Sequence, residues 1–346
     1  MTEIHSDITV LFMWEVPERL RDYLREGLQD VHNVRLIFPE PAEESTFIEH
    51  APDADIIVGW RPSEELLDAA RQLRLFINPG VGVQHLIEKF RKLNETRKVL
   101  LANGHGNTYF TAQHVVAMLL ALMNRIIPHH EWMVEGKWRT GDSDARSIPL
   151  RNRKIGLLGY GAVNTKVHRM LSGFDVEFAA LKRNPERDRG EESCEVELSR
   201  MYSPDELDEF LDWTDILVVG VPQTSETIGM IGANELSRLG EDGIIVNVSR
   251  GPVVDEKDLY EALKDEKIAG AAIDVWYEYR PEPDETGRKY PYHYPFHELD
   301  NVVLSPHRGA SPMNDLKRWD EVIENITRMA EGRNNFINIV NLHDEY

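Results

Sequence analysis

Short apolar runs alternate with amphipathic stretches along the first hundred residues. The apolar runs are ITVLFMW from Ile8, VRLIF from Val34, ADIIVGW from Ala54, RLFINPGVGV from Arg74 and KVLLANG from Lys98. Between them, segments such as VPERLRDYLREGL and SEELLDAARQL space their apolar residues as one face of a helix does. Strands separated by helices predict a parallel α/β sheet.

A second series of six apolar runs begins at Lys154 with KIGLLGYG and continues through VEFAAL, ILVVGVP, GIIVNVSRG, AGAAIDVW and NVVLSPH. Six runs of strand length, separated by helical or polar segments, are typical of a doubly wound nucleotide-binding sheet. Between the two series, the apolar stretch from Tyr109 to Ile127 predicts one long helix, which we interpret as a buried connector between two lobes.

The stretch from Asn314 to Glu331 is amphipathic and predicts a helix that returns to the first lobe. Its apolar residues, spaced to face a core, are Leu316, Trp319, Val322, Ile323, Ile326 and Met329. The expected domains are therefore residues 1–108 with 313–346, a discontinuous substrate domain, and residues 109–312, a dinucleotide-binding domain. A length of 346 residues fits two domains.

Composition narrows the class of protein. With 41% hydrophobic and 29% charged residues, the chain is not intrinsically disordered. No apolar run is long enough for a membrane span and the N-terminus does not resemble an export signal, so we expect neither. The single cysteine, Cys194, cannot form an internal disulfide or a multi-thiolate metal site. These features predict a cytoplasmic protein.

The formal net charge of −21 makes nucleic acid an unexpected partner, because such a surface repels phosphate backbones. An acidic chain of this kind resembles the proteins of salt-accumulating microbes. An ordinary acidic bacterial protein is the alternative interpretation, since net charge concerns solubility rather than fold.

The run KIGLLGYGAVN contains two glycines of a G-x-G-x-x-G dinucleotide fingerprint, Gly159 and Gly161, with Asn164 in the third position. Gly159 allows the tight turn, and Gly161 lets the backbone approach a pyrophosphate. The helix that begins with Ala162 and Val163 offers its free N–H groups to that anion. Asn164 disfavours the assignment, because a side chain there should loosen the contact between helix and strand.

After the next strand, Lys182 and Arg183 occupy the position where an acidic residue would normally bind the ribose 2′-hydroxyl. Two cations there suit a 2′-phosphate. We therefore expect NADP as the cofactor, with NAD as the second choice.

Several segments together resemble the D-isomer-specific 2-hydroxyacid dehydrogenases, the superfamily of glyoxylate, hydroxypyruvate and phosphoglycerate dehydrogenases. They are GVGVQHL, NGHGNTYFTAQHVVAMLLAL, TDILVVGVPQTSETIGMIG, VNVSRGPVVDEKDLYEAL, AGAAIDVW and NVVLSPHRGA. The resemblance runs from about Val58 to Gly332. It implies two Rossmann-like lobes, a flavodoxin-like substrate lobe and a doubly wound dinucleotide-binding lobe, with the active site in the cleft, and a homodimer.

The resemblance also implies roles for individual residues. Arg250 would bind the substrate carboxylate and polarise the carbonyl, and His307 would exchange a proton with the substrate oxygen. Asp274, Val221 and Pro222 would contact the cofactor. A planar guanidinium and an imidazole that titrates near neutrality are also the groups that reduction of a 2-keto acid needs on chemical grounds.

The glutamate that pairs with the histidine in this family is out of register. Five residues after Asp274 stands Tyr279 rather than glutamate, and Pro281 comes one residue late. We expect Glu278 to be the partner of His307 and keep Tyr279 and Glu282 as alternatives.

In the first lobe, the resemblance implies that backbone N–H groups at Val81 and Gly82 hold the substrate carboxylate. Arg61, just after the strand DIIVGW, is a second candidate for an anionic group. The spacing of the histidines does not predict a metal site.

The sequence therefore predicts a reductase for a small 2-keto acid of the glyoxylate or hydroxypyruvate kind, using NADP(H) or NAD(H). Formate- or phosphite-type oxidation on the same fold is one alternative. A nucleotide-sensing regulator with weak activity is another.

Overall fold

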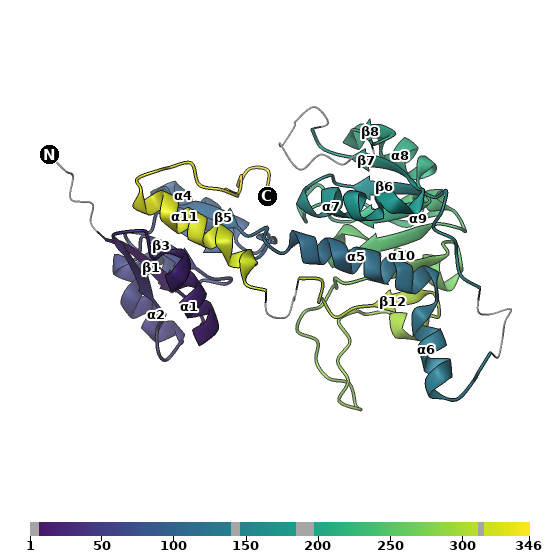
Figure 1. Cartoon of the computed structure of the whole chain (residues 1–346), viewed down its shortest axis with the longest axis horizontal. Helices are drawn as coiled ribbons and strands as arrows, with labels where there is room; N and C mark the ends of the chain where they lie inside the picture. Colours follow the sequence, from purple (N-terminus) through teal and green to yellow (C-terminus); the bar gives the residue numbers. More distant parts are fainter. Residues whose placement is uncertain (1–6, 140–145, 185–196, 311–314) are drawn as a thin grey trace. The chain divides into compact units, whose positions relative to one another are not determined.

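The computed structural model describes residues 7–139, 146–184, 197–310 and 315–346, and the chain forms two compact units (Figure 1). Unit 1 consists of Met1–Asn107 and Met313–Tyr346, and unit 2 of Thr108–Pro312. Cys194 and Asn314 lie outside the described residues.

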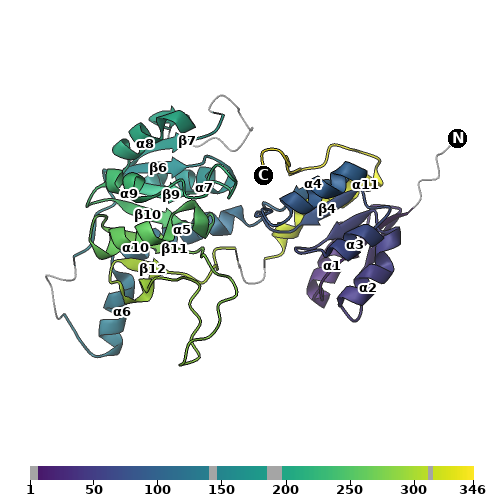
Figure 2. The ribbon, with the colours of Figure 1, turned by 180° about the vertical axis from the view of Figure 1, so that it is seen from behind.

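Unit 1 is built on a five-stranded parallel sheet in the order β2-β1-β3-β4-β5, the flavodoxin-like arrangement. Helices α1 and α11 cover one face, and α2, α3 and α4 cover the other (Figures 1 and 2). The strands are β1 (Ile8–Phe12), β2 (Val34–Ile37), β3 (Ile56–Val58), β4 (Leu75–Asn78) and β5 (Leu100–Asn103). The helices are α1 (Glu18–Gly27), α2 (Glu44–His50), α3 (Glu64–Ala69), α4 (Ile87–Thr96) and α11 (Asp320–Ala330).

The C-terminal helix completes the core of unit 1. Val322, Ile326 and Met329 lie three or four residues apart on one face of α11 and are buried against β1 and β3. Trp319, just before the helix, is buried in the same cluster. The expected amphipathic helix is therefore present over Asp320–Ala330, with its apolar face in the core of unit 1.

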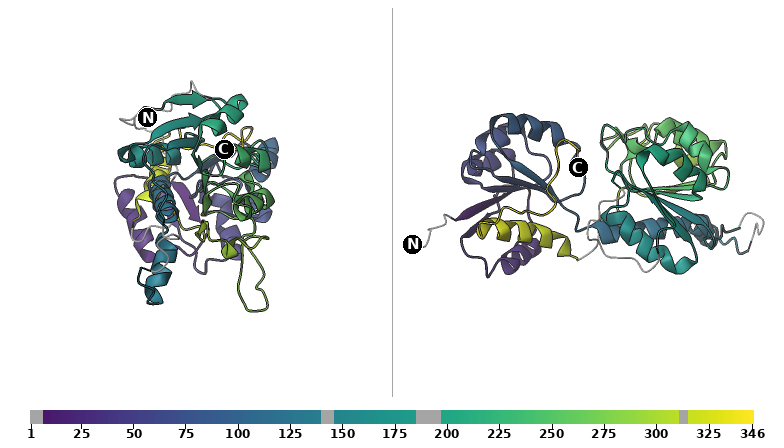
Figure 3. Two further views of the ribbon diagram at one scale, coloured as in Figure 1. Left: turned by 90° about the vertical axis from the view of Figure 1, so that its right-hand side faces the viewer. Right: turned by 90° about the horizontal axis from the view of Figure 1, so that it is seen from above.

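Unit 2 is built on a seven-stranded parallel sheet in the order β12-β11-β10-β9-β6-β7-β8. Each sheet lies between two layers of helices (Figure 3), with α5 and α7 on one face of this one and α8, α9 and α10 on the other. The strands are β6 (Lys154–Leu158), β7 (Glu177–Leu181), β8 (Arg200–Tyr202), β9 (Ile216–Val219), β10 (Ile244–Asn247), β11 (Gly270–Ile273) and β12 (Val302–Leu304). The helices are α5 (Thr108–Met123), α6 (Ile126–Val134), α7 (Ala162–Leu171), α8 (Leu207–Trp213), α9 (Ala233–Leu239) and α10 (Glu256–Lys264).

The predicted α/β class with two parallel sheets is confirmed, with three corrections. The second sheet gains β8, a three-residue edge strand that pairs with β7. The single helix expected from Tyr109 to Ile127 is two helices, because Arg125 adopts a left-handed backbone with φ 52° and the chain turns by 64° there. Helix α5 belongs to unit 2, where it packs on α7 and the sheet, rather than connecting the lobes.

Among the described residues, no single helix is long and apolar enough to cross a membrane. Helices α5 and α6 meet that length and composition only when taken together across their bend.

Candidate active site

Three loops with functional side chains follow three neighbouring strands of the sheet in unit 2. Arg250 follows β10, Asp274 directly follows β11, and His307 follows β12. These strands are adjacent and parallel, with Asn247 paired to Ile273 and Ile273 paired to Leu304. Their carboxyl ends therefore lie at one edge of the sheet, where ligands bind in open α/β folds.

The turn after β10 presents Arg250. The buried Asn247 side chain accepts hydrogen bonds from the N–H and hydroxyl of Ser249, and it donates to the carbonyl of Arg250 at 3.2 Å. Gly251 is needed because a Cβ there would lie 2.4 Å from the carbonyl oxygen of Trp276. Among the described residues no carboxylate pairs with Arg250, and desolvation by burial lowers the pKa of its guanidinium.

Asp274 holds the loop that follows β12. Its carboxylate accepts hydrogen bonds from Ser305 Oγ at 2.5 Å and from the N–H groups of Arg308 and Gly309 at 2.7 and 2.9 Å. Burial by itself raises the pKa of Asp274, but hydrogen bonds from His114, Ser305 and the loop outweigh it, so the net pKa is lowered. A Cβ at Gly309 would lie 2.9 Å from Asp274 Oδ2, which explains the glycine after His307 and Arg308.

The partner of His307 is Tyr279. Its hydroxyl oxygen lies 2.7 Å from His307 Nδ1. The carboxylate of Glu278 instead accepts a hydrogen bond from the N–H of Arg280 at 2.6 Å, so the expectation that Glu278 contacts His307 is wrong. The physical reason is that the Glu278 carboxylate bonds to the backbone of its own loop, which leaves Tyr279 as the side chain beside the imidazole.

The pKa of His307 is lowered from its usual value, chiefly by desolvation of the ring and next by the positive charge of Arg250. The positive charge of Arg250 therefore disfavours the protonated form of the ring. His307 also adopts a left-handed backbone with φ 56°, which residues other than glycine adopt at some energetic cost.

The dinucleotide fingerprint lies where the strand order reverses, between β6 and β9. Gly159 has φ 83°, and a Cβ there would lie 2.9 Å from Val221 Cγ1 after β9. A Cβ at Gly161 would meet nothing within 4 Å, so the backbone faces open space in front of α7. No side chain caps the N-terminus of α7, which leaves the N–H groups of Ala162 and Val163 to a ligand. These residues fit a dinucleotide pyrophosphate.

Asn164 tightens this turn rather than loosening it. Its buried side-chain amide donates to the carbonyls of Gly159 at 2.6 Å and of Leu158 and Val218 at 3.3 Å. One side chain therefore connects the end of β6 to β9. The close approach is made possible by Gly220, where a Cβ would lie 2.6 Å from Asn164 Nδ2.

Lys182 and Arg183 directly follow β7, the strand next to β6. Both side chains are partly exposed, and an Arg183 Nη2 atom lies 2.6 Å from Glu226 Oε2 in an ion pair. A 2′-phosphate at this position would therefore share Arg183 with Glu226. Pro222 lies on the same segment as Glu226, and its carbonyl accepts a hydrogen bond from Thr227 Oγ1.

In unit 1, side chains from the ends of β4 and β5 hold the carbonyls of the loop Gly80–Gly82. Asn78 Nδ2 donates to the carbonyls of Gly80 and Gly82, and Asn103 Nδ2 donates to that of Val81 at 2.7 Å. Within the described chain, the N–H groups of Val81 and Gly82 meet no acceptor. Such a loop can bind an anion. Arg61 is exposed and forms no ion pair with the described residues.

The residues that sequence reasoning missed are Asn78, Asn103 and the pair His114 and Ser305. Each asparagine is the last residue of a strand and precedes a turn, a position that favours side-chain hydrogen bonds to nearby backbone. That pattern could have identified both. His114 Nε2 lies 2.9 Å from Ser305 Oγ across 191 positions of sequence, which no local signal reveals.

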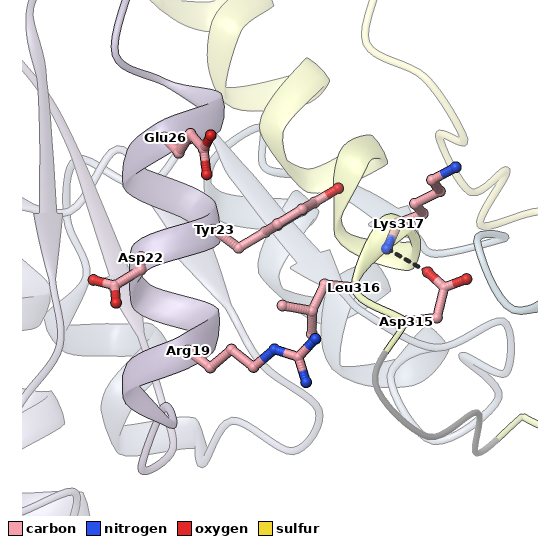
Figure 4. A pocket seen from close by; sticks show the side chains of 7 residues that line it. All are labelled: Arg19, Asp22, Tyr23, Glu26, Asp315, Leu316 and Lys317. Carbon is pink, nitrogen blue, oxygen red and sulfur yellow. Dashed lines mark hydrogen bonds between the residues drawn. The ribbon is translucent and has the colours of Figure 1, made fainter.

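A surface pocket of unit 1 lies between α1 and the segment Asp315–Lys317 (Figure 4). Its lining mixes acidic and basic side chains, and none of the predicted site residues is among them. No group of three potential metal ligands gathers within the described ranges.

The chain is similar to several known proteins. Residues 116–309 match the family described as "D-isomer specific 2-hydroxyacid dehydrogenase, NAD binding domain". The chain is 30% identical over 330 residues to a D-3-phosphoglycerate dehydrogenase of Archaeoglobus fulgidus, which covers 93% of this chain and 57% of that longer protein. It is 30% identical over 303 residues to a glyoxylate reductase of Korarchaeum cryptofilum, which covers 84% of each chain.

Among solved structures, the fold resembles an NADPH-dependent glyoxylate/hydroxypyruvate reductase of Sinorhizobium meliloti in complex with NADP and malonate. The TM-score is 0.72 at 24% sequence identity, and the likeness covers 98% of each chain.

Replacing Asn164 by leucine tests its role at the turn. Three carbonyls lose a buried donor, so we expect the free energy of unfolding of unit 2 to fall by about 1–3 kcal/mol and NADPH to bind more weakly. Urea denaturation and calorimetric titration measure the two effects. The matched control is Asn124→Leu, an exposed asparagine that donates only to Leu120. Equal effects from both variants would contradict the role of Asn164.

Proposed function

The chain belongs to the D-isomer-specific 2-hydroxyacid dehydrogenase family, and on that premise we propose that it reduces a small 2-keto acid to the D-2-hydroxy acid with NADPH. Glyoxylate and hydroxypyruvate are the substrates we expect. Unit 2 contains the family's NAD-binding domain, and in this proposal unit 1 is the substrate domain.

Two features of the site support this proposal most directly. The guanidinium of Arg250 has no carboxylate partner among the described residues, and the imidazole of His307 is held by a hydrogen bond with Tyr279. Arg250 binds the keto acid's carboxylate in two-point fashion and stabilises the charge that grows on the neighbouring carbonyl oxygen. His307 donates the proton that this oxygen takes up. Tyr279 fixes the orientation of the ring through Nδ1, which leaves Nε2 for the substrate.

When bound, the nicotinamide cofactor supplies the hydride. The residues that would hold its pyrophosphate are Gly159, Gly161 and the first turn of α7, as the uncapped helix and the open face at Gly161 suggest. Lys182 and Arg183 would bind the 2′-phosphate. Asp274 contributes by holding the loop of His307, because its carboxylate is already engaged there.

The loop of Val81 and Gly82 would bind the anionic end of the substrate through its unpaired N–H groups. The exposed Arg61 would add a positive charge for the same anionic group.

We also propose that the protein works as a homodimer in the cytoplasm. Large apolar residues are exposed on α6 and just after it: Ile126, Met133, Val134 and Trp138. Such a row favours contact with a second copy. The net charge of −21 supports a further proposal, that the protein is adapted to high salt, where self-repulsion is screened.

The activity is tested by NADPH oxidation with glyoxylate, hydroxypyruvate and pyruvate. We expect turnover, and Arg250→Gln should lower kcat/KM by about 10²–10³-fold because the transition state loses its charge-stabilising donor. The exposed Arg151→Gln of the same unit is the charge-matched control and should change little. Tight NADPH binding without turnover of any keto acid would instead favour the regulator.

The pH profile tests the neutral partner of His307. Reduction needs the protonated imidazole, and kcat/KM reports the pKa of the free enzyme. Because that pKa is lowered from 6.5, we expect kcat/KM to fall as the pH rises through a value below 6.5. Tyr279→Glu places a carboxylate beside the ring and should move the fall to higher pH. A wild-type fall centred above 6.5 would contradict this assignment.

Two further variants separate the neighbouring side chains. Tyr279→Phe should lower the rate by about tenfold, since the ring loses its positioning hydrogen bond. Glu278→Gln should leave the rate and the pH profile unchanged.

Cofactor preference tests Lys182 and Arg183. We expect NADPH to be used more efficiently than NADH, and the double variant Lys182→Asp with Arg183→Ser should narrow or reverse the ratio of kcat/KM values. A wild-type preference for NADH of tenfold, about 1.4 kcal/mol, would show that the two cations do not read the 2′-phosphate.

A further inference from the structure

The ion pair between Arg183 and Glu226 joins the segments on either side of the fingerprint strand of unit 2. Strand β6 lies between β7 and β9 in the sheet and is parallel to both. Arg183 follows β7 and Glu226 belongs to the segment after β9, yet Arg183 Nη2 lies 2.6 Å from Glu226 Oε2. The pair therefore connects the carboxyl ends of the two neighbours of β6.

Hydrogen bonds fix the segment that presents Glu226. Thr227 Oγ1 donates to the carbonyl of Pro222 at 2.6 Å and accepts from the N–H of Thr224 at 2.8 Å. The N–H of Glu226 donates to Thr224 Oγ1 at 3.3 Å. Both threonines are buried, whereas 72% of the Glu226 side chain is exposed. The backbone of Glu226 is thus held in place, while its carboxylate can be reached by a ligand.

The carboxylate of Glu226 lies where the sequence after β7 lacks an acid. In a dinucleotide-binding fold, an acidic side chain after the second strand accepts the hydrogen bond of the ribose 2′-hydroxyl. Lys182 and Arg183 occupy that position here. Through the ion pair, Glu226 brings a carboxylate to the same strand end from a different loop.

The two nicotinamide cofactors make opposite demands on this pair. NAD(H) has a 2′-hydroxyl, which donates a hydrogen bond to a carboxylate. NADP(H) has a 2′-phosphate, which accepts two hydrogen bonds from a guanidinium and is repelled by a carboxylate. Because an exposed ion pair is weak, either group can take the place of one partner.

We propose that Glu226 is a specificity-determining residue for the cofactor, which accepts the 2′-hydroxyl of NAD(H) and competes with the 2′-phosphate of NADP(H) for Arg183. One ion pair then lets the same site take both cofactors, and it narrows the preference for NADPH that Lys182 and Arg183 create. This inference rests on the proposed function, because it concerns the cofactor of that reaction.

The experiment measures the binding of NADH and NADPH, which differ only in the 2′ group, by calorimetric titration without a keto acid. Glu226→Ala should tighten NADPH binding by about 3- to 10-fold, because Arg183 loses its competing carboxylate. The same variant should weaken NADH binding by about 3- to 10-fold, because the 2′-hydroxyl loses its acceptor. Any result in which the two affinities do not move in opposite directions overturns the inference.

Two further variants separate charge from hydrogen bonding. Glu226→Gln removes the charge but keeps an oxygen that accepts a hydrogen bond. It should tighten NADPH binding as alanine does and weaken NADH binding less than alanine does. Glu241→Ala is the matched control, since Glu241 is exposed before β10 at the opposite edge of the sheet, and it should change neither affinity.

A double-mutant cycle tests the competition for Arg183 directly. In the Arg183→Gln background, Glu226→Ala should give a clearly smaller gain in NADPH affinity than in the wild type, because no guanidinium is left to compete for. An equal gain in both backgrounds would mean that Glu226 acts on the phosphate by repulsion alone, and it would overturn the inference.

The binding measurements also separate this inference from the proposed reaction. Opposite shifts of NADH and NADPH affinity support the role of Glu226 even if no keto acid is reduced. Reduction of glyoxylate by a protein whose affinities for both nucleotides are indifferent to Glu226 overturns the inference and leaves the proposed function standing.

Discussion

The buried carboxylate of Asp274 is the interaction on which the geometry of the reactive edge depends. It accepts hydrogen bonds from one hydroxyl and two backbone N–H groups of the segment that follows β12, and His114 of α5 adds a further donor. A buried charge is tolerated when it is satisfied in this way, and removing its donors would leave it uncompensated. The same bonds fix the backbone on both sides of His307 and so maintain its left-handed conformation. The position of the imidazole thus depends on an acid that need not touch the substrate.

Most of the fold could be predicted from sequence, because buried parallel strands are continuous apolar runs. All five strands of unit 1 and six of unit 2 correspond to such runs. Strand β8 was not predicted because Arg200–Tyr202 has only three residues, lies at the edge of the sheet and contains an arginine. The bend at Arg125 was not predicted because the apolar pattern continues through it. A single residue with a left-handed backbone does not change the hydrophobic periodicity.

The candidate site could be predicted only where a residue's neighbours in sequence determine its position. Arg250 and His307 follow strand ends, so their approximate location follows from topology. The choice between Glu278 and Tyr279 depends on how one loop turns, and that path is set by contacts distant in sequence. The expectation for Asn164 was wrong because it considered only the size of the side chain. Its amide also donates hydrogen bonds to backbone carbonyls of the turn.

The discontinuity of unit 1 has a consequence for the order in which the protein can fold during synthesis. Residues 319–329 supply one side of its core, yet they are translated after the whole of unit 2. Until they emerge from the ribosome, the apolar residues of β1 and β3 that face α11, among them Val10 and Ile56, remain in contact with water. Unit 2 can complete its sheet in that interval. The core of unit 1 is therefore completed last, although its strands are synthesised first. These strands are the part of the chain that most needs protection from aggregation during synthesis.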